Sequence, residues 1–218
     1  MSEGGDRRAR KKAATRALVL ETAQRLFAER GFDAVTISDI AATADVAVQT
    51  VFNHFATKEE LFFAGRAPWV EAPAGAVRTR PEGACPLAAL RRALVAEVEA
   101  HIAGLADPEH RGMVATMTAS PALQAHEREL NDRSRARLHA ALVESWSVAG
   151  AEYRPADVHL TAALVAATWM AAARTVAAET REPLPDPAEV PERTRDAASL
   201  AEQVLSDLEA ALRTRDAA

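Results

Sequence analysis

Helical periodicity along most of the chain is the feature that most limits its fold. Apolar residues recur three and four positions apart over long segments, and no convincing run alternates apolar with polar residues as a strand does. About nine helices are predicted, at 14–30, 37–44, within 48–58, and at 58–64, 87–105, 110–119, 121–148, 155–180 and 192–214. The sequence therefore predicts an all-α protein.

Composition divides these helices into two groups. Residues 1–13 are predicted to be a basic flexible arm, and 14–65 a compact bundle of small helices. Residues 66–86 are rich in proline, glycine and alanine, which predicts a loop or linker. Longer helices fill 87–218, interrupted by a proline-rich loop before the last helix. We expect two domains joined by this linker.

The net charge of −5 hides a strong asymmetry. Residues 1–16 hold six basic and two acidic groups, or +4, whereas residues 66–218 hold 17 basic and 22 acidic groups, or −5. The basic residues of the arm are Arg7, Arg8, Arg10, Lys11, Lys12 and Arg16. A basic arm on an acidic body is typical of local attraction to phosphates, although such arms also occur as solvated tails.

Several classes of protein are not favoured by this sequence. No uninterrupted apolar run reaches the roughly 18 residues of a membrane span, and the N-terminal residues lack the apolar stretch of a signal peptide. The single cysteine, Cys85, is assigned no role, and the histidines show no paired metal-ligand spacing. We therefore expect a cytoplasmic protein without a metal, cofactor or enzymatic activity.

Capping signals bracket the small helices near the N-terminus. Gly31 is placed to end the first helix and Thr36 to begin the second, while Asp45 tolerates a left-handed turn. Thr57, followed by Glu60, has the pattern of a capping box for the fourth helix. The first helix is predicted to bury Leu18, Thr22, Leu26 and Phe27 on one side.

The stretch VQTVFNHFATK at 48–58 combines large apolar and polar residues. At about 100° per residue, Val51 and Phe55 fall on one side of a helix, while the amides of Gln49 and Asn53 lie on the remaining arc. An amide offers a donor and an acceptor that match adenine in the major groove, and Val48 or Phe52 suits a thymine methyl group. Short helices joined by a tight turn are typical of a helix-turn-helix. The alternative is that Gln49 and Asn53 are merely solvated.

Residues 14–61 resemble the DNA-binding domain of the TetR family of bacterial one-component repressors. The matching positions are Ala23, Leu26, Phe27, Gly31, Thr36, Ile40, Ala41, Ala44, Val46, Thr50, Val51, Phe52, His54, Phe55, Lys58 and Leu61. The resemblance implies an N-terminal three-helix DNA-binding domain and a C-terminal helical domain for ligand binding and dimerisation. It also implies phosphate contacts from Thr36, Thr50, His54 and Lys58, and base contacts from Ser38, Val48, Gln49, Phe52 and Asn53.

The chain departs from the family pattern at three positions. Phe52 stands where tyrosine is usual, so a hydroxyl that could bond a phosphate is missing. Asp45 stands where glycine is usual and brings a negative charge near the turn. Ala47 replaces a common serine cap, which leaves amides at the start of the reading helix without a side-chain partner. These changes bear on DNA affinity rather than on the fold.

The C-terminal half supplies candidate residues for a dimer and for a ligand. Apolar residues repeat on two helices, and we expect the interface to contain Leu164, Ala167, Ala171, Leu200, Val204, Leu208 and Leu212. Bulky or adaptable residues that are candidates to line a ligand cavity are Trp69, His101, Met113, Met117, Trp146, Trp169 and Met170. In both cases the alternative is burial within a single chain, which is the commoner fate of tryptophan and methionine.

The sequence thus predicts a DNA-binding transcriptional regulator. The expected form is a repressor that binds an inverted-repeat operator as a homodimer and is released by a small organic, mainly apolar ligand. One alternative is an adaptor with the same fold that binds a protein partner instead of double-stranded DNA. A small helical metalloenzyme is the other, although it would need clustered glutamates and histidines on facing helices.

Overall fold

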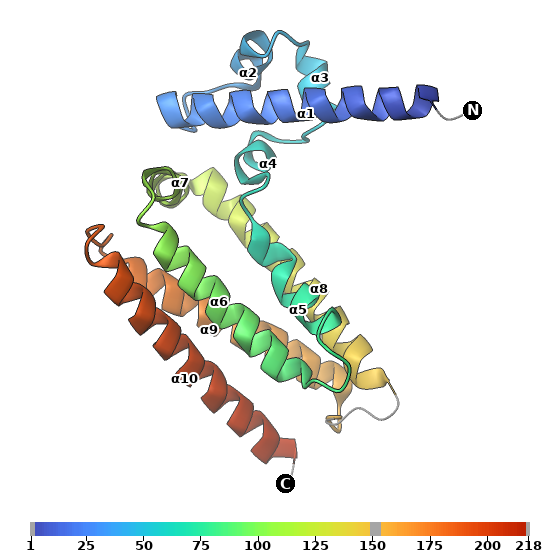
Figure 1. The fold of residues 1–218 in the computed structure, drawn as a ribbon, viewed down its shortest axis with the longest axis vertical. Helices are drawn as coiled ribbons and strands as arrows, with labels where there is room; N and C mark the ends of the chain where they lie inside the picture. Colours follow the sequence, from blue (N-terminus) through green and yellow to red (C-terminus); the bar gives the residue numbers. More distant parts are fainter. Residues whose placement is uncertain (1–2, 149–153, 217–218) are drawn as a thin grey trace. The chain divides into compact units, whose positions relative to one another are not determined.

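The computed structural model describes residues 3–148 and 154–216, with side chains at 7–148 and 154–214 (Figure 1). Over these residues the chain is helical and contains no strand, which confirms the all-α prediction. The helices are α1 (Glu3–Arg30), α2 (Ile37–Thr43), α3 (Val48–Phe52), α4 (Lys58–Phe63), α5 (Ala72–Arg78), α6 (Pro86–Gly104), α7 (Pro108–Ala119), α8 (Pro121–Ser147), α9 (Val158–Arg181) and α10 (Val190–Asp216), with a short 3-10 helix, η1 (Pro68–Val70).

The chain forms two compact units, here named the head and the body. The head contains Met1–Ala67 and Gly112–Glu127, and the body contains Pro68–Arg111 and Arg128–Ala218. The segment 112–127 therefore joins the head, whereas the sequence assigned it to the C-terminal domain. Within the head, the Ser120 hydroxyl donates to Asp33 Oδ1 at 3.3 Å, and the His126 ring stacks on Phe63 with centroids 5.5 Å apart.

The core of the head is built on one face of α1. Val19, Ala23, Leu26 and Phe27 are buried there, and α2 and α3 lie on one side of the helix with α4 on the other (Figure 1). The rings of Phe27, Phe32, Phe62 and Phe63 form a continuous cluster with centroid distances between 5.2 and 6.1 Å. Leu18, predicted to be buried, is 46% exposed because the buried face runs through Val19 instead.

The predicted caps of the small helices are present. Gly31 has φ 81° and Asp45 has φ 52°, the left-handed conformation expected at both turns. Thr36 forms a full capping box with Asp39, whose carboxylate accepts from the Thr36 amide at 2.8 Å. The Thr36 hydroxyl and then the Thr36 amide, which both donate to this carboxylate, hold the pKa of Asp39 below its usual value. At the fourth helix, Thr57 accepts from the Glu60 amide, but Glu60 Oε2 accepts from Ala56 rather than from Thr57.

The basic arm and the linker both differ from the sequence prediction. Helix α1 begins at Glu3, so the described part of the predicted flexible arm continues the first helix. Alanine, arginine and lysine dominate residues 7–16, and these are strong helix formers. The predicted linker 66–86 contains η1 and α5, and α5 buries Pro73, Ala74 and Val77. Its proline sits in the first turn, where proline is compatible with a helix.

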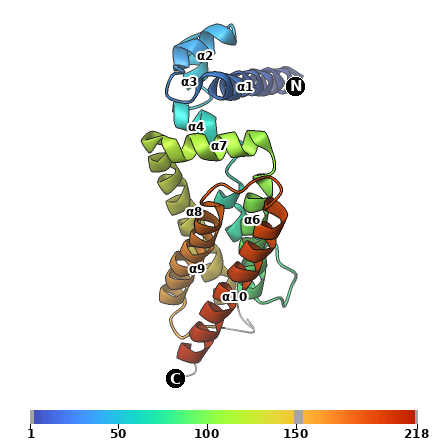
Figure 2. The ribbon, with the colours of Figure 1, turned by 90° about the vertical axis from the view of Figure 1, so that its left-hand side faces the viewer.

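The body is organised around α6, α9 and α10, which lie side by side (Figure 2). Arg91 of α6 pairs with Glu202 at 3.1 Å and with Glu209 at 2.9 Å, both on α10. Helix α9 is long and apolar enough to span a membrane by length and composition, yet it carries a row of residues buried in the bundle, including Trp169 and Met170. Such a helix is equally typical of the core of a helical domain, which is the role it has here.

Candidate nucleic-acid interface

Helix α3 has the predicted division between buried anchors and outward side chains. Val51 and Phe55 are fully buried, whereas Gln49 and Asn53 are exposed. Val48 is 40% exposed and Phe52 45%, although both are large apolar residues. Exposed apolar side chains beside exposed amides form a surface that suits the edges of base pairs. We call Val48, Gln49, Phe52 and Asn53 the reading face.

The reading face is carried by a very short helix. Helix α3 spans five residues, Val48–Phe52, and its N-cap residue, Ala47, makes no side-chain capping bond. Asn53 ends the helix, and Gln49 Nε2 donates to Asn53 Oδ1 at 3.3 Å. The two amides are therefore bonded to each other across one turn, a contact that the sequence did not predict. Ser38 of α2, the other predicted base-reading residue, is exposed as well.

An open groove of about 400 Å³ separates α3 from the N-terminal part of α1. From α1 it is lined by Arg8, Lys11, Lys12 and Thr15, and from the α3 region by Thr50, Asn53 and His54. The four α1 positions follow the spacing i, i+3, i+4 and i+7, so one face of a continuous helix presents all of them. Helix formation in the arm thus gathers three cations beside the predicted phosphate contacts Thr50 and His54.

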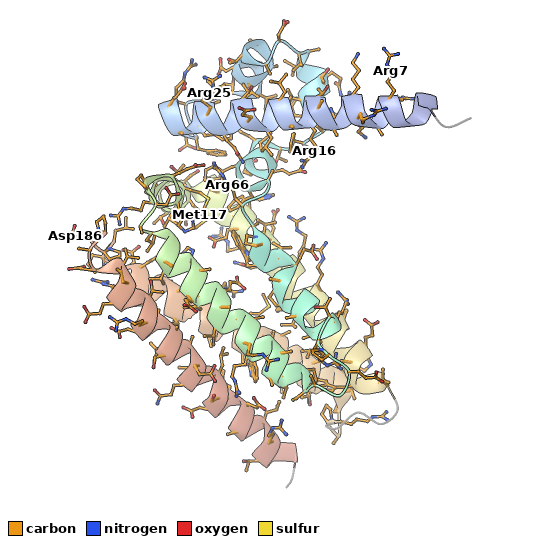
Figure 3. The ribbon with its side chains drawn as sticks, viewed as in Figure 1. Arg7, Arg16, Arg25, Arg66, Met117 and Asp186 are labelled. Carbon is orange, nitrogen blue, oxygen red and sulfur yellow. The ribbon has the colours of Figure 1, made fainter. Side chains whose placement is uncertain are left out.

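The remaining cations of the arm point in other directions. Arg16 follows Arg7 by nine positions, and Figure 3 shows the two on opposite sides of α1. The Arg16 guanidinium lies over the Phe55 ring, 4.5 Å from its centroid, so it contacts one of the two anchors. Residues 7–20 contain no Asp or Glu, so the positive charge of this helix is not neutralised along the chain. Phosphate groups are suited to such a surface.

Two of the predicted phosphate contacts are also used inside the head. Lys58 Nζ donates to the carbonyls of Phe32 and Val35, at 3.0 Å each, and lies 4.2 Å from the Phe32 ring centroid. The Thr36 hydroxyl bonds the Asp39 carboxylate at 2.6 Å. Lys58 therefore fastens the loop that precedes α2. One of its three N–H bonds remains for a phosphate, so the predicted contact stays a prediction.

Comparison with known proteins agrees with this geometry. Residues 19–64 match the family described as bacterial regulatory proteins, tetR family. The head therefore carries a tetR-type domain at residues 19–64. A curated relative, the HTH-type transcriptional regulator TcmR of Streptomyces glaucescens, is 30% identical over 135 residues. That match spans 60% of this chain and 60% of the relative, less than two thirds of its length.

Solved structures of the tetR family share the fold of this chain. The complex of SmeT, a Stenotrophomonas maltophilia repressor, with triclosan has a TM-score of 0.56 at 18% identity, over 89% of this chain and 91% of that one. A TetR-family regulator from Streptomyces coelicolor A3 has a TM-score of 0.50 at 25% identity, over 86% and 94%. The likeness extends beyond the head, because it covers most of each chain.

The predicted ligand residues fall in both units. Met113 and Met117 belong to the head, whereas the others belong to the body. Met117, Trp146, Trp169 and Met170 are buried, which also fits the ordinary core role of such residues. His101 has polar surroundings, since its ring lies 5.3 Å from that of His110. Burial, followed by the nearby His110 and Arg181, lowers the pKa of His101 to about 4, so its ring is neutral near pH 7.

Glu97, one helical turn before His101, is a polar residue of the body that the sequence reading missed. Burial raises its pKa to about 7, although the charge of Arg174 acts in the opposite direction. Its Oε2 is buried without a hydrogen-bond partner, and so is His110 Nε2. The spacing of Glu97 and His101, four positions apart on the same helix, was the available signal. Glu97 and His101 thus lie one turn apart on α6, and His110 lies beside His101.

The predicted dimer residues lie at the surface of the single chain. Leu164 is 39% exposed and Leu200 48%, while Ala171 is exposed and Ala167 and Val204 are partly buried. Leu208 and Leu212 are partly buried too. Ala201 and Leu205 of α10 turn inward and are fully buried, so the outward row is distinct from the core-facing row. An apolar surface of this kind is available for a second copy, which stays a prediction.

Lys58 has two candidate roles, one in the fold of the head and one in phosphate binding, and this leads to a prediction about stability. Lys58→Met keeps the packing over Phe32 but removes two charge-assisted hydrogen bonds, so we expect the free energy of unfolding to fall by about 1 to 3 kcal/mol. Urea denaturation monitored by circular dichroism measures this change. Lys12→Met, at an exposed position of the same head, should change it by less than about 0.5 kcal/mol. Unchanged stability for Lys58→Met, together with weakened DNA binding, would instead assign Lys58 mainly to a phosphate.

Proposed function

We propose that this tetR-family protein is a transcriptional repressor that binds double-stranded DNA through the reading face of α3. The observation that carries the proposal is that Gln49 and Asn53 are exposed directly above two buried anchors, Val51 and Phe55. A helix held in this way can enter a major groove without disturbing the core of the head. The relative TcmR is an HTH-type transcriptional regulator, which is consistent with the proposal.

Phosphate contacts supply the sequence-independent part of the binding. The groove between α1 and α3 brings Arg8, Lys11 and Lys12 next to Thr50 and His54. Cations on one face of a helix can follow the DNA backbone while α3 occupies the groove. Neutralising phosphates releases counterions, so binding must weaken steeply as salt rises. A protein-binding adaptor, favoured only by the missing hydroxyl at Phe52, would not share this dependence.

DNA binding is tested by selecting bound duplexes from a random-sequence pool at low salt. The selected duplex should bind with an affinity that falls linearly against salt on logarithmic axes. Changing Arg8, Lys11 and Lys12 together to Gln should reduce that slope by about 3, roughly 1 for each lost phosphate contact. A matched variant with Arg92, Arg133 and Arg195 of the body changed to Gln should leave the slope unchanged. Failure to select any duplex sinks the DNA-binding proposal in favour of the adaptor.

Dimerisation follows from the geometry of DNA recognition and from the outward row on α9 and α10. One helix-turn-helix makes few contacts, and two-fold pairing on an inverted repeat is the usual solution. We expect two heads to bind half-sites about 34 to 36 Å apart, or farther apart where operators are longer. In the proposed dimer, α9 and α10 of each chain form a four-helix interface.

The dimer has a direct test in analytical ultracentrifugation. Leu164→Glu and Leu200→Glu each place a charge in the proposed interface, so we expect the dissociation constant of the dimer to rise by at least about thirtyfold, or roughly 2 kcal/mol. Leu184→Glu is the control, since Leu184 is 42% exposed in the loop before α10. A wild-type protein that sediments as a single chain at micromolar concentration would contradict the proposal.

A small organic ligand is proposed to release the repressor from DNA. The shared fold with SmeT, solved in complex with triclosan, supports a ligand-binding role for a body of this kind. The candidate surroundings are mainly apolar, with the polar residues Glu97, His101 and His110 as exceptions. A ligand can shift DNA binding only if it binds one conformation of the protein more tightly than the other.

Ligand release is tested by an electrophoretic mobility shift assay with triclosan as the first probe, followed by a panel of small aromatic compounds. A compound that releases the wild type should need about tenfold more to release His101→Ala, because a neutral buried donor or acceptor is lost. His159→Ala, at an exposed histidine of α9, should respond like the wild type. Equal potency on both variants would remove His101 from the ligand site.

A further inference from the structure

The bond between Gln49 and Asn53 determines which of their polar atoms face outward. Gln49 Nε2 donates to Asn53 Oδ1 at 3.3 Å, and both side chains are exposed. After this bond, Gln49 Oε1 keeps its full capacity as an acceptor, and the Asn53 amide nitrogen keeps both of its N–H donors. The pair therefore presents an acceptor at its Gln49 end and a donor at its Asn53 end.

That arrangement differs from two independent readers of adenine. A single amide that reads adenine uses its own oxygen on the N6 amino group and its own nitrogen on N7. Here one N–H of Gln49 and one lone pair of Asn53 are already engaged with each other. The acceptor and the donor that remain lie on different side chains, one helical turn apart, so they reach neighbouring base pairs more readily than a single base.

We propose that Gln49 and Asn53 act as one coupled reader of two adjacent base pairs in each half-site. Gln49 Oε1 accepts from the amino group of adenine or cytosine, and the Asn53 amide donates to N7 of a purine in the next base pair. The inference rests on the proposed DNA-binding function and adds the chemistry of the half-site. It also predicts that neither residue keeps its preference when the other is removed.

The apolar half of the reading face adds a second element to the half-site. Val48 and Phe52 are four residues apart, like Gln49 and Asn53, so the two pairs form parallel stripes displaced by one residue. Both apolar side chains are exposed in a helix whose neighbouring core is already filled by Val51 and Phe55. The 5-methyl group of thymine is the apolar feature of the major groove. A thymine is therefore expected next to the two base pairs read by the amides.

The test uses the duplex obtained by selection and the full-length protein. Gln49→Ala and Asn53→Ala are compared with the double variant, with Thr43→Ala at an exposed position of α2 as the control. We expect each single variant to weaken binding about five- to tenfold and to relax the preference at both positions. The double variant should bind about as well as the weaker single variant, because the second change removes a contact already lost. All four variants should unfold at the wild-type temperature.

Modified bases locate each contact on the same duplex. Replacing the purine by its 7-deaza form removes N7, and replacing the amino-bearing base by an analogue without that amino group removes the donor. Each change should weaken DNA binding by the wild type about five- to tenfold. The 7-deaza purine should have no further effect on Asn53→Ala, and loss of the amino group should have no further effect on Gln49→Ala. Deoxyuridine in place of thymine removes one methyl group and should weaken DNA binding by the wild type about threefold. It should not weaken binding by Phe52→Ala.

The outcomes separate this inference from the proposed function. Additive losses, with each variant relaxing one position only, would show independent readers and overturn the coupled pair while leaving DNA binding intact. Insensitivity to deoxyuridine at every thymine would overturn the methyl contact. A protein that selects no duplex at all overturns the proposed function and the inference together.

Discussion

The burial of Val51 and Phe55 is the interaction on which the rest of the head depends. A helix of five residues cannot be stable alone, because helix nucleation is costly and only a few hydrogen bonds follow it. Burying a valine and a phenylalanine contributes about 1.5 to 3 kcal/mol each, which is enough to fix so short an element. Its orientation is therefore set by the core of the head rather than by the helix itself. The exposed side chains inherit that fixed orientation.

Polar residues outside α3 also stabilise the head. Lys58 donates to the carbonyls of Phe32 and Val35, and Asp39 accepts from the amide of Thr36, so these three backbone groups of the loop before α2 have hydrogen-bond partners. The left-handed turn at Asp45 then leads into α3 without a side-chain cap at Ala47. These features explain how the residues that resemble phosphate contacts also serve the fold. One side chain can stabilise the fold and also contact a phosphate when it has more hydrogen-bonding groups than it uses inside the protein.

Much of this fold follows from local sequence signals. The periodicity of the long helices, the turn at Gly31 and the caps at Thr36 and Thr57 predicted most elements, because each depends on residues close together in the chain. The outward position of Gln49 and Asn53 followed from helical geometry in the same way. The hydrogen bond between the Gln49 and Asn53 side chains could not be predicted in this way, because it depends on rotamers. The bonds from Lys58 to two carbonyls could not be predicted either, because they depend on tertiary contacts. The sequence did not predict the helical arm, because its dense charge suggested a solvated tail, and it did not predict α5, because the proline and glycine of that segment suggested a loop.

The continuity of α1 has a mechanical consequence for the protein. One uninterrupted helix connects the cations Arg8, Lys11 and Lys12 to the buried face formed by Val19, Ala23 and Leu26. A flexible tail would sample many directions and contribute an averaged attraction. A rigid helix instead acts as a lever, so a rotation of the head about its axis turns these charges through the same angle. The attraction of these charges to a polyanion therefore depends on the same orientation of the head that sets the direction of α3.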